Sequence, residues 1–72
     1  MSARELKIKQ KGIIKEIVVE DKQQRQRLLD LGFIPGTEIS CYRKIFGSSA
    51  FEVKGSVFGL RNEMAKDIIL ES

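Results

Sequence analysis

The sequence of 72 residues predicts a mainly β fold. It indicates a small, strongly bent barrel of about five short strands, with one short helix inserted over residues 22–31 and a helical turn over residues 62–66. Three observations support this: β-branched and aromatic residues recur in short runs with alternating polarity, turns with glycine separate the runs, and a single segment has helix-capping signals at both ends. A chain this short buries only a thin core, so we expect residues 1–72 to form a single domain.

The first long strand is predicted over residues 13–19, where β-branched residues dominate. Residues 6–11 form a short edge strand or an extended lead-in before it, and a glycine separates the two segments. Alternation places Ile13 and Ile17 on one face and Ile14 on the other. We therefore expect this strand to be partly covered on both faces.

Capping signals delimit the helix predicted over residues 22–31. Asp21 is a good N-cap residue, and Gln24 three positions later completes a capping-box pattern. The first half of the helix is wholly polar, and its apolar residues, including Leu28 and Leu31, lie at the C-terminal end. A helix this short is marginal alone, so these leucines must dock on the sheet.

The run that ends the helix predicts a stop followed by a tight turn. Gly32 fits the C′ position of a Schellman cap, which needs left-handed backbone, and Phe33 at C″ would then cover Leu28. Pro35 and Gly36 fit the two central positions of a type II turn. Two reversals this close together fix how the helix meets the sheet.

The second half of the chain predicts four strands. They are expected over residues 37–45, 50–54, 57–61 and 67–71. Turns are expected over residues 46–49 and at Gly55-Ser56, and Asn62 is expected to cap the helical turn. The side chains expected to face inward are Ile39, Cys41, Phe51, Val53, Ile68 and Leu70.

Composition bounds the function. The chain has 13 basic and 10 acidic residues and a net charge of +3, which leans towards acidic partners but is modest for a nucleic-acid binder. No apolar run is long enough to span a membrane, and the polar start has no apolar region of a secretory signal. The single cysteine fits a reducing compartment. We therefore expect a cytoplasmic protein.

Residues for catalysis and metal binding are scarce. The chain has no histidine and no P-loop pattern, so a histidine-based catalytic site and a P-loop nucleotide site are excluded within it. Cys41 is interpreted as a buried core residue. The carboxylates that could form a weak oxygen site are interpreted as surface acids: Glu52, Glu63, Asp67 and Glu71. We therefore expect no enzyme activity, no cofactor, and no catalytic or metal site.

These motifs together resemble the FeoA family, the ferrous iron transport protein A domain. The resemblance is strongest over residues 27–39, which match R-L-x-x-L-G-[hydrophobic]-x-P-G-T-x-[hydrophobic]. The start of the first strand, the Val-Lys-Gly turn at residues 53–55 and the run over residues 60–70 continue it, so it covers about residues 6–71. The loop over residues 45–49 departs from the pattern, because it lacks the prolines that family members often carry there.

The residues that carry the resemblance are interpreted as structural: Leu28, Leu31, Gly32, Phe33, Pro35, Gly36, Gly55, Leu60 and Ala65. The resemblance implies an SH3-like β-barrel and a small cytosolic accessory of FeoB, the membrane Fe(II) transporter with a cytosolic GTPase domain. It implies no direct membrane insertion. The family's association with transition-metal ions finds no evident ligands in this sequence. Whether such a module activates, inhibits or scaffolds the transporter stays open, as does its oligomeric state.

Candidate partner contacts are the residues that folding does not explain. Ile45 and Phe46 are apolar at a predicted hairpin tip, and Tyr42 is expected to point outward beside them. Arg25 on the polar face of the helix offers charge for steering a partner. Arg61 before the helical turn is a further candidate contact, in a sharper version as a GTPase-activating finger, with a surface or salt-bridging residue as the alternative. For the other candidates the alternative is local packing or solubility.

Two other function classes are considered. A nucleic-acid-binding barrel would use aromatic residues interleaved with basic ones, namely Tyr42, Phe46, Phe51 and Phe58 with Arg43, Lys44, Lys54 and Arg61. A metal-binding carrier is the third class. We favour the protein-binding module over both.

Overall fold

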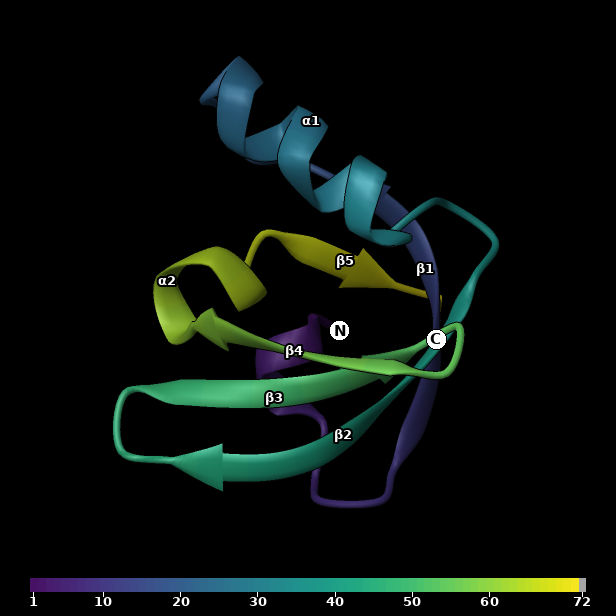
Figure 1. Cartoon of the computed structure of the whole chain (residues 1–72), viewed down its shortest axis with the longest axis vertical. Coiled ribbons are helices and arrows are strands. Elements are labelled where there is room, and N and C mark those ends of the chain that lie inside the picture. Colours follow the sequence, from purple (N-terminus) through teal and green to yellow (C-terminus); the bar gives the residue numbers. More distant parts are fainter. Residues whose placement is uncertain (72) are drawn as a thin grey trace.

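The computed structural model of the protein describes residues 1–71 (Figure 1). Its elements, in chain order, are η1 (Ala3–Glu5, a 3-10 helix), β1 (Lys11–Ile17), α1 (Lys22–Leu31), β2 (Glu38–Ile45), β3 (Ser48–Val53), β4 (Ser56–Arg61), α2 (Asn62–Ala65) and β5 (Ile68–Leu70). This confirms the predicted mainly β fold with one short inserted helix and a helical turn. The turn ends one residue earlier than predicted, and η1 was not predicted.

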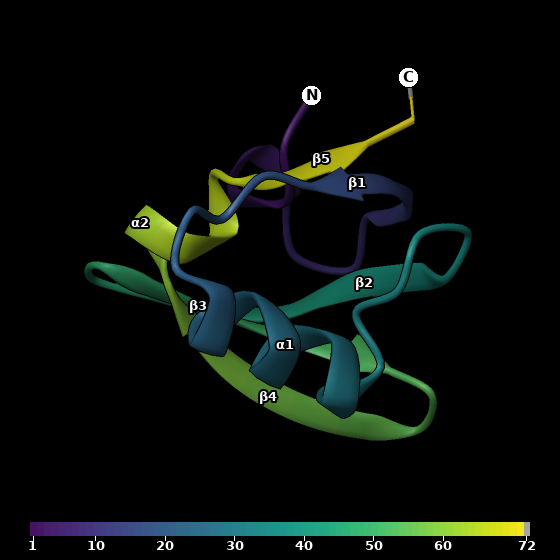
Figure 2. The ribbon, with the colours of Figure 1, turned by 90° about the horizontal axis from the view of Figure 1, so that it is seen from above.

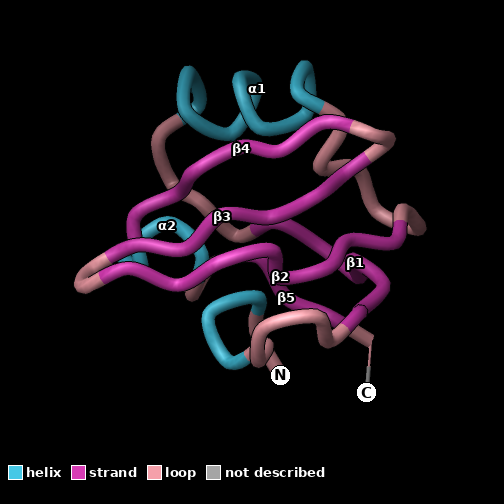
Figure 3. Tube along the Cα trace, turned by 60° about the horizontal axis from the view of Figure 1, so that its bottom comes forward, coloured by secondary structure: helices cyan, strands magenta, loops and turns pink. Residues whose placement is uncertain are grey.

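The five strands form one antiparallel sheet with the order β4-β3-β2-β1-β5. The sheet bends so that β1 and β5 fold over β2, β3 and β4 (Figure 2). Helix α2 connects β4 to β5, which are the first and last strands in this order. Helix α1 runs alongside β4 at the open side of the bent sheet (Figure 3). The amino end pairs with β5 through a bridge between Ser2 and Ile69.

Strand β1 begins earlier than the sequence predicted. Gly12 does not separate two strands but lies inside β1, where an added Cβ would come within 2.8 Å of Leu70 Cδ1. The expected lead-in strand is reduced to a single bridge at Ile8. Ile14 is fully buried while Ile13 is half-buried, so β1 is covered on both faces as expected. β1 ends at Ile17 rather than at residue 19, and its pairing with β5 is irregular between Ile14 and Glu16.

Both predicted ends of α1 are confirmed, but of the capping box predicted for Asp21 and Gln24 only the Asp21 side-chain bonds are formed between these residues. The Asp21 carboxylate accepts hydrogen bonds from the backbone N–H groups of Gln23 and Gln24, at 2.8 and 3.1 Å. At the other end Gly32 is left-handed, with φ of 108°, and donates to Leu29 O at 3.0 Å. Phe33 N donates to Leu28 O at 3.0 Å. These two bonds define the Schellman cap.

The type II turn after the helix is also confirmed. Thr37 N donates to Ile34 O at 2.9 Å across the turn, and Gly36 takes a φ of 92°. Gly36 N also donates to Ile14 O at 2.7 Å, so the turn is fastened to β1.

The first hairpin turn is shorter than predicted, and the second has the predicted length but begins one residue earlier. Phe46 and Gly47 alone connect β2 to β3, and Lys54 and Gly55 alone connect β3 to β4. Lys54 and Gly55 have φ values of 51° and 82°, as a two-residue hairpin turn allows. Strand β3 therefore begins two residues earlier than predicted and ends one residue earlier, and β4 begins one residue earlier.

The predicted cap of α2 is wrong by one residue. Arg61 occupies the N-cap position, and Asn62 is the first residue of the helix. The Asn62 side chain accepts a hydrogen bond from Ser49 Oγ at 3.5 Å. Ser49 is almost fully buried, so its hydroxyl needs a partner, and Asn62 supplies one. β5 is also shorter than predicted, covering residues 68–70.

The core fills the inside of the bent sheet. Its buried side chains are Ala3, Leu6, Ile14, Val19, Leu28, Phe33, Ile39, Cys41, Phe51, Val53, Leu60, Ala65, Ile68 and Leu70. All six side chains expected to face inward from the last four strands are among them. Phe33 packs edge-on against Phe58 with ring centroids 6.2 Å apart, which joins the segment after α1 to β4.

Candidate functional site

The hairpin tip, formed by Ile45, Phe46 and Gly47, exposes apolar side chains. Phe46 is fully exposed, and 60% of Ile45 is exposed. Gly47 takes the positive φ of 80° that the turn needs, so the turn makes no special demand on residue 46. Short turns usually carry small polar residues. Folding therefore does not explain the apolar pair, which makes it a candidate contact.

A β-bulge lies behind the hairpin tip. Cys41 pairs with Phe51, but the next pair is Arg43 with Ala50, so Tyr42 is an extra residue in β2. The extra residue shifts the alternation, and both Tyr42 and Arg43 are exposed. In a regular strand, alternation would turn Arg43 inward. The bulge instead adds Arg43 to the outward-facing side chains of β2.

Basic side chains lie behind the hairpin tip on β2. Lys44 Nζ donates to the backbone carbonyl of Arg4 at 3.1 Å, which ties η1 to the hairpin. No acidic residue lies in the chain between Glu38 and Glu52. The hairpin beyond the bulge is therefore apolar at its end and positive just behind it.

The register brings a further arginine to the same side. Ile45 pairs with Ser48, and Ser48 pairs with Arg61 on β4. The exposed side chains gathered at this end of the sheet are called the tip surface: Tyr42, Arg43, Lys44, Ile45, Phe46 and Arg61. Four of the five predicted contacts, Tyr42, Ile45, Phe46 and Arg61, belong to it.

Arg25 lies outside the tip surface. It is half-buried on α1, and its Nη1 donates to the Val19 carbonyl at 3.3 Å. This bond fastens α1 to the segment that follows β1. Arg25 is thus partly engaged within the fold, and a contact through it stays a prediction.

A groove of about 780 Å³ separates α1 from β4 and α2. Apolar side chains such as Leu31, Phe58 and Met64 line it, together with charges of both signs. The lining residues are Val19, Gln24, Arg27, Leu28, Leu31, Phe58, Gly59, Leu60, Arg61, Glu63, Met64, Lys66 and Asp67. Mixed charge on its walls gives no clear preference for a ligand.

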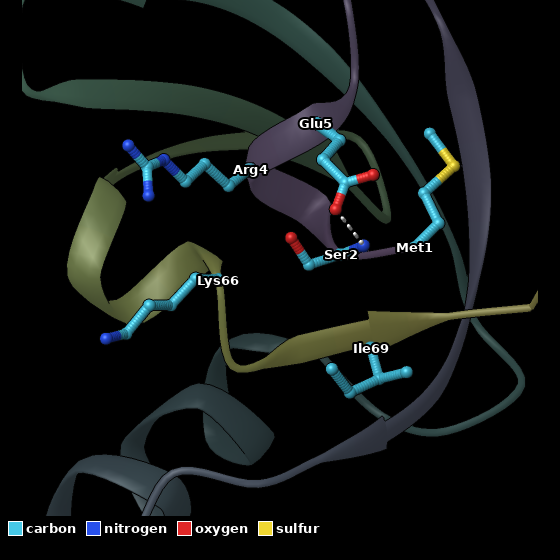
Figure 4. A pocket seen from close by; sticks show the side chains of 6 residues that line it. All are labelled: Met1, Ser2, Arg4, Glu5, Lys66 and Ile69. Carbon is cyan, nitrogen blue, oxygen red and sulfur yellow. Dashed lines mark hydrogen bonds between the residues drawn. The ribbon is translucent and has the colours of Figure 1, made fainter.

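A second hollow, of about 500 Å³, lies beside the amino end (Figure 4). Met1, Ser2, Arg4, Glu5, Lys66 and Ile69 line it. The Arg4 and Lys66 side chains extend in the same direction, away from Met1 (Figure 4). Ser2 N donates to Glu5 Oε1 at 3.4 Å, so this carboxylate is engaged in closing η1. The feature is shallow and carries no convergent polar groups.

The residues present do not fit a metal ion. Within residues 1–71 no group of three or more His, Cys, Asp or Glu side chains lies close enough together to hold one. Cys41 is buried, and its Sγ lies 3.9 Å from the Arg43 carbonyl. A zinc or iron site needs several nitrogen, sulfur or oxygen ligands directed at one point. We therefore propose no role for a bound metal in this chain.

Two of the four aromatics proposed for nucleic-acid stacking do not face solvent. Phe51 is fully buried, and Phe58 is half-buried against Phe33. Bases stack on exposed rings, and of these four only Tyr42 and Phe46 are exposed. The structure therefore disfavours the nucleic-acid hypothesis.

Sequence reasoning missed the contribution of Arg4 to the tip surroundings. The contact between Lys44 and Arg4 joins residues 40 positions apart, so no local sequence pattern predicts it.

Within residues 1–71 no helix is long and apolar enough to cross a membrane.

The chain is similar to proteins of one family. The profile of the FeoA domain matches residues 1–72. The NMR structure of an FeoA-like protein from Clostridium acetobutylicum is 33% identical, with a TM-score of 0.84, over 99% of this chain and 84% of that one. No curated protein matches this chain.

Two further structures share the fold. The crystal structure of Stenotrophomonas maltophilia FeoA complexed with zinc, described as an SH3 domain protein, is 24% identical, with a TM-score of 0.85, over 99% of this chain and 89% of that one. The solution structure of iron(II) transport protein A from Clostridium thermocellum is 25% identical, with a TM-score of 0.86, over 99% of this chain and 44% of that one. These likenesses confirm the predicted SH3-like barrel.

Proposed function

The chain belongs to the FeoA domain family, which is associated with ferrous iron transport, and we propose that it is a cytoplasmic protein-binding module for a FeoB-type Fe(II) transporter. In this proposal the module binds the cytosolic GTPase part of the transporter. Binding changes the GTPase cycle or the assembly of the transporter. Fe(II) is the cargo of the transporter and is not held by the module.

The observation that carries this proposal is the tip surface. It gathers exposed tyrosine, arginine and apolar side chains on a rigid antiparallel sheet, although folding needs none of them exposed. Tyrosine and arginine are the residue types enriched at energetically dominant interface positions. A binding module needs an accessible surface of this kind rather than a catalytic constellation.

The partner contact is assigned to the outer face of β2, β3 and β4. Arg43 on β2 pairs with Ala50 on β3, and Ala50 pairs with Gly59 on β4, so small residues occupy this row on β3 and β4. Tyr42 on β2 and Arg61 on β4 are larger exposed side chains near this row. Small residues allow close approach of a partner, and the two larger side chains supply anchors. Ile45 and Phe46 border this face at the hairpin tip.

The proposal includes no catalytic role and no metal site for this chain. The Stenotrophomonas protein was crystallised with zinc. In residues 1–71 of this chain no group of three or more His, Cys, Asp or Glu side chains is placed to hold a metal ion, so we assign it no metal-carrier role.

The experiment is a titration of the full chain against the soluble GTPase domain of the transporter, without nucleotide, with GDP and with a non-hydrolysable GTP analogue. We expect Tyr42→Ala and Arg61→Ala each to weaken binding about tenfold, since hot-spot truncations commonly do this. Ile34→Ala and Lys15→Ala are matched controls, because both side chains are exposed away from the tip surface. Absence of binding in every nucleotide state would overturn the proposal.

A further inference from the structure

The hairpin tip is a convex projection with an apolar end. A turn of two residues leaves no loop to fold back over Phe46, so its ring projects beyond β2 and β3. Ile45 precedes it and is exposed over more than half its area, at 60%. The end of the hairpin thus presents one apolar point rather than a flat patch.

Basic side chains lie next to this apolar end, on the residues of β2 that precede Ile45. Arg43 and Lys44 come directly before Ile45, and Arg61 lies in register on β4. Lys44 reaches Arg4, whose side chain extends on the same side of the molecule as Lys66 (Figure 4). The nearest acidic residues along the hairpin are Glu38 and Glu52, which lie at the opposite end of β2 and late in β3. On the neighbouring α2, the exposed Glu63 follows Asn62, whose N–H donates to Gly47 O at 3.0 Å.

This order of side chains matches the layers of a bilayer surface. Apolar side chains are stable at the acyl boundary, while lysine and arginine extend their charged ends to the phosphate layer. Tyrosine is enriched at the same interface, and Tyr42 lies on the exposed face behind the charges. Anionic lipids attract such basic groups.

The size of the tip favours lipid over a protein pocket. A stable protein interface buries about 800 Å² on each partner, which two side chains at the end of a hairpin do not supply. A bilayer needs only a few inserted side chains and gives weak, reversible attachment. The basic charges fit a phosphate-rich plane.

We propose that the hairpin tip is a peripheral anchor for anionic membrane surfaces, in which Phe46 and Ile45 enter the acyl boundary and Arg43 and Lys44 contact lipid phosphates. The inference goes beyond the proposed function, because it needs no transporter, and it departs from the expectation of no direct membrane insertion. It places the outer face of β2, β3 and β4 next to the bilayer, where the cytosolic part of a membrane protein is within reach.

The experiment uses the absence of tryptophan from the chain. Phe46→Trp places a single fluorescent reporter at the tip, and Val57→Trp places one at an exposed apolar position on β4 outside it. Each full-length variant is mixed with vesicles of equal parts phosphatidylglycerol and phosphatidylcholine, or of phosphatidylcholine alone. We expect a blue shift of the Phe46→Trp emission with the anionic vesicles only, and no shift for Val57→Trp.

Co-sedimentation with the same vesicles tests the chemistry of the contact. Phe46→Ser should weaken binding about tenfold, because it removes a large apolar side chain from the buried end. Arg43→Gln with Lys44→Gln should weaken binding and flatten its dependence on salt. Lys11→Gln with Lys15→Gln removes the same charge from β1 and should leave binding near that of the parent chain.

Three results would overturn the anchor. One is the absence of a blue shift with anionic vesicles. Another is an equal shift for Val57→Trp, which would indicate adsorption without orientation. The third is a shift of the Phe46→Trp emission that needs the soluble GTPase domain and no lipid, which would make the tip a protein contact. The titration of the proposed function runs without lipid, so either inference can fail while the other stands.

Discussion

The chain reverses at residues 32–36 and again at residues 46–47, and glycine supplies the positive φ in both places. The residues beside the glycines differ. Next to Gly32, the side chain of Phe33 is fully buried and packs against Phe58. Next to Gly47, the side chain of Phe46 is fully exposed. A glycine with positive φ thus occurs in both turns. At Gly32 the turn anchors α1, and at Gly47 it leaves an apolar side chain exposed to solvent.

The two regions differ in how far folding explains their residues. The segment over residues 28–37 lies within the part of the sequence where the resemblance to the family is strongest, and its bonds and buried side chains explain its residues. The tip surface carries no comparable motif, and packing explains little of it. We infer that the first region positions the helix and that the second contacts partners.

Phe33→Ala should have the largest effect on stability. Removing a fully buried ring leaves a cavity beside Phe58, and such changes reduce the free energy of unfolding by about 3–5 kcal/mol. Urea denaturation followed by circular dichroism measures it. A loss below about 1 kcal/mol would contradict the role given to this side chain.

Gly32→Val should come second. A β-branched residue is strained at a φ of 108°, and its Cβ would also lie 3.4 Å from Lys54 Cδ. Strain at such positions costs about 1–3 kcal/mol. Gly59→Val is the matched variant, since Gly59 has no positive φ and an added Cβ there meets nothing within 4 Å. Equal melting temperatures for the two variants would show that the left-handed backbone at Gly32 adds no strain.

Asp21→Ala should have a smaller effect. It removes the acceptor for Gln23 N and Gln24 N at the start of α1, and the loss of an N-cap costs about 1 kcal/mol. Asp21→Asn should restore most of the stability, because asparagine caps helices equally well. If the alanine and asparagine variants unfold at the same urea concentration, the cap contributes nothing.

Phe46→Ser should leave stability nearly unchanged. The side chain is fully exposed, and surface substitutions of this kind change the free energy of unfolding by less than about 0.5 kcal/mol. The same urea experiment measures it. A large loss would mean that the ring has a structural role, and the tip would then not be free for a partner or a membrane.

The sequence predicted α1 to the residue because both of its ends depend on local contacts. Asp21 bonds within three residues, and Gly32 and Phe33 bond within five. Hairpin lengths and strand ends were predicted less well, because the pairing of distant strands decides them. The inclusion of Gly12 in β1 depends on its close approach to Leu70, which no local pattern encodes.

The candidate site could be predicted only in part. Exposed apolar residues in a turn pointed to Ile45 and Phe46. The bulge at Tyr42 depends on the register between β2 and β3, and the contact between Lys44 and Arg4 depends on the fold of the whole chain. The clustering of Arg61 with the hairpin tip likewise appears only once the strands are paired.

The most direct test of the separation between folding and recognition compares Asp21→Ala with Tyr42→Ala in the titration against the soluble GTPase domain. At a temperature where both variants are folded, Asp21→Ala should bind like the parent chain despite its lower stability. Tyr42→Ala should bind about tenfold more weakly with unchanged stability. Weakened binding by the folded Asp21→Ala chain, or parental binding by Tyr42→Ala, would contradict the account.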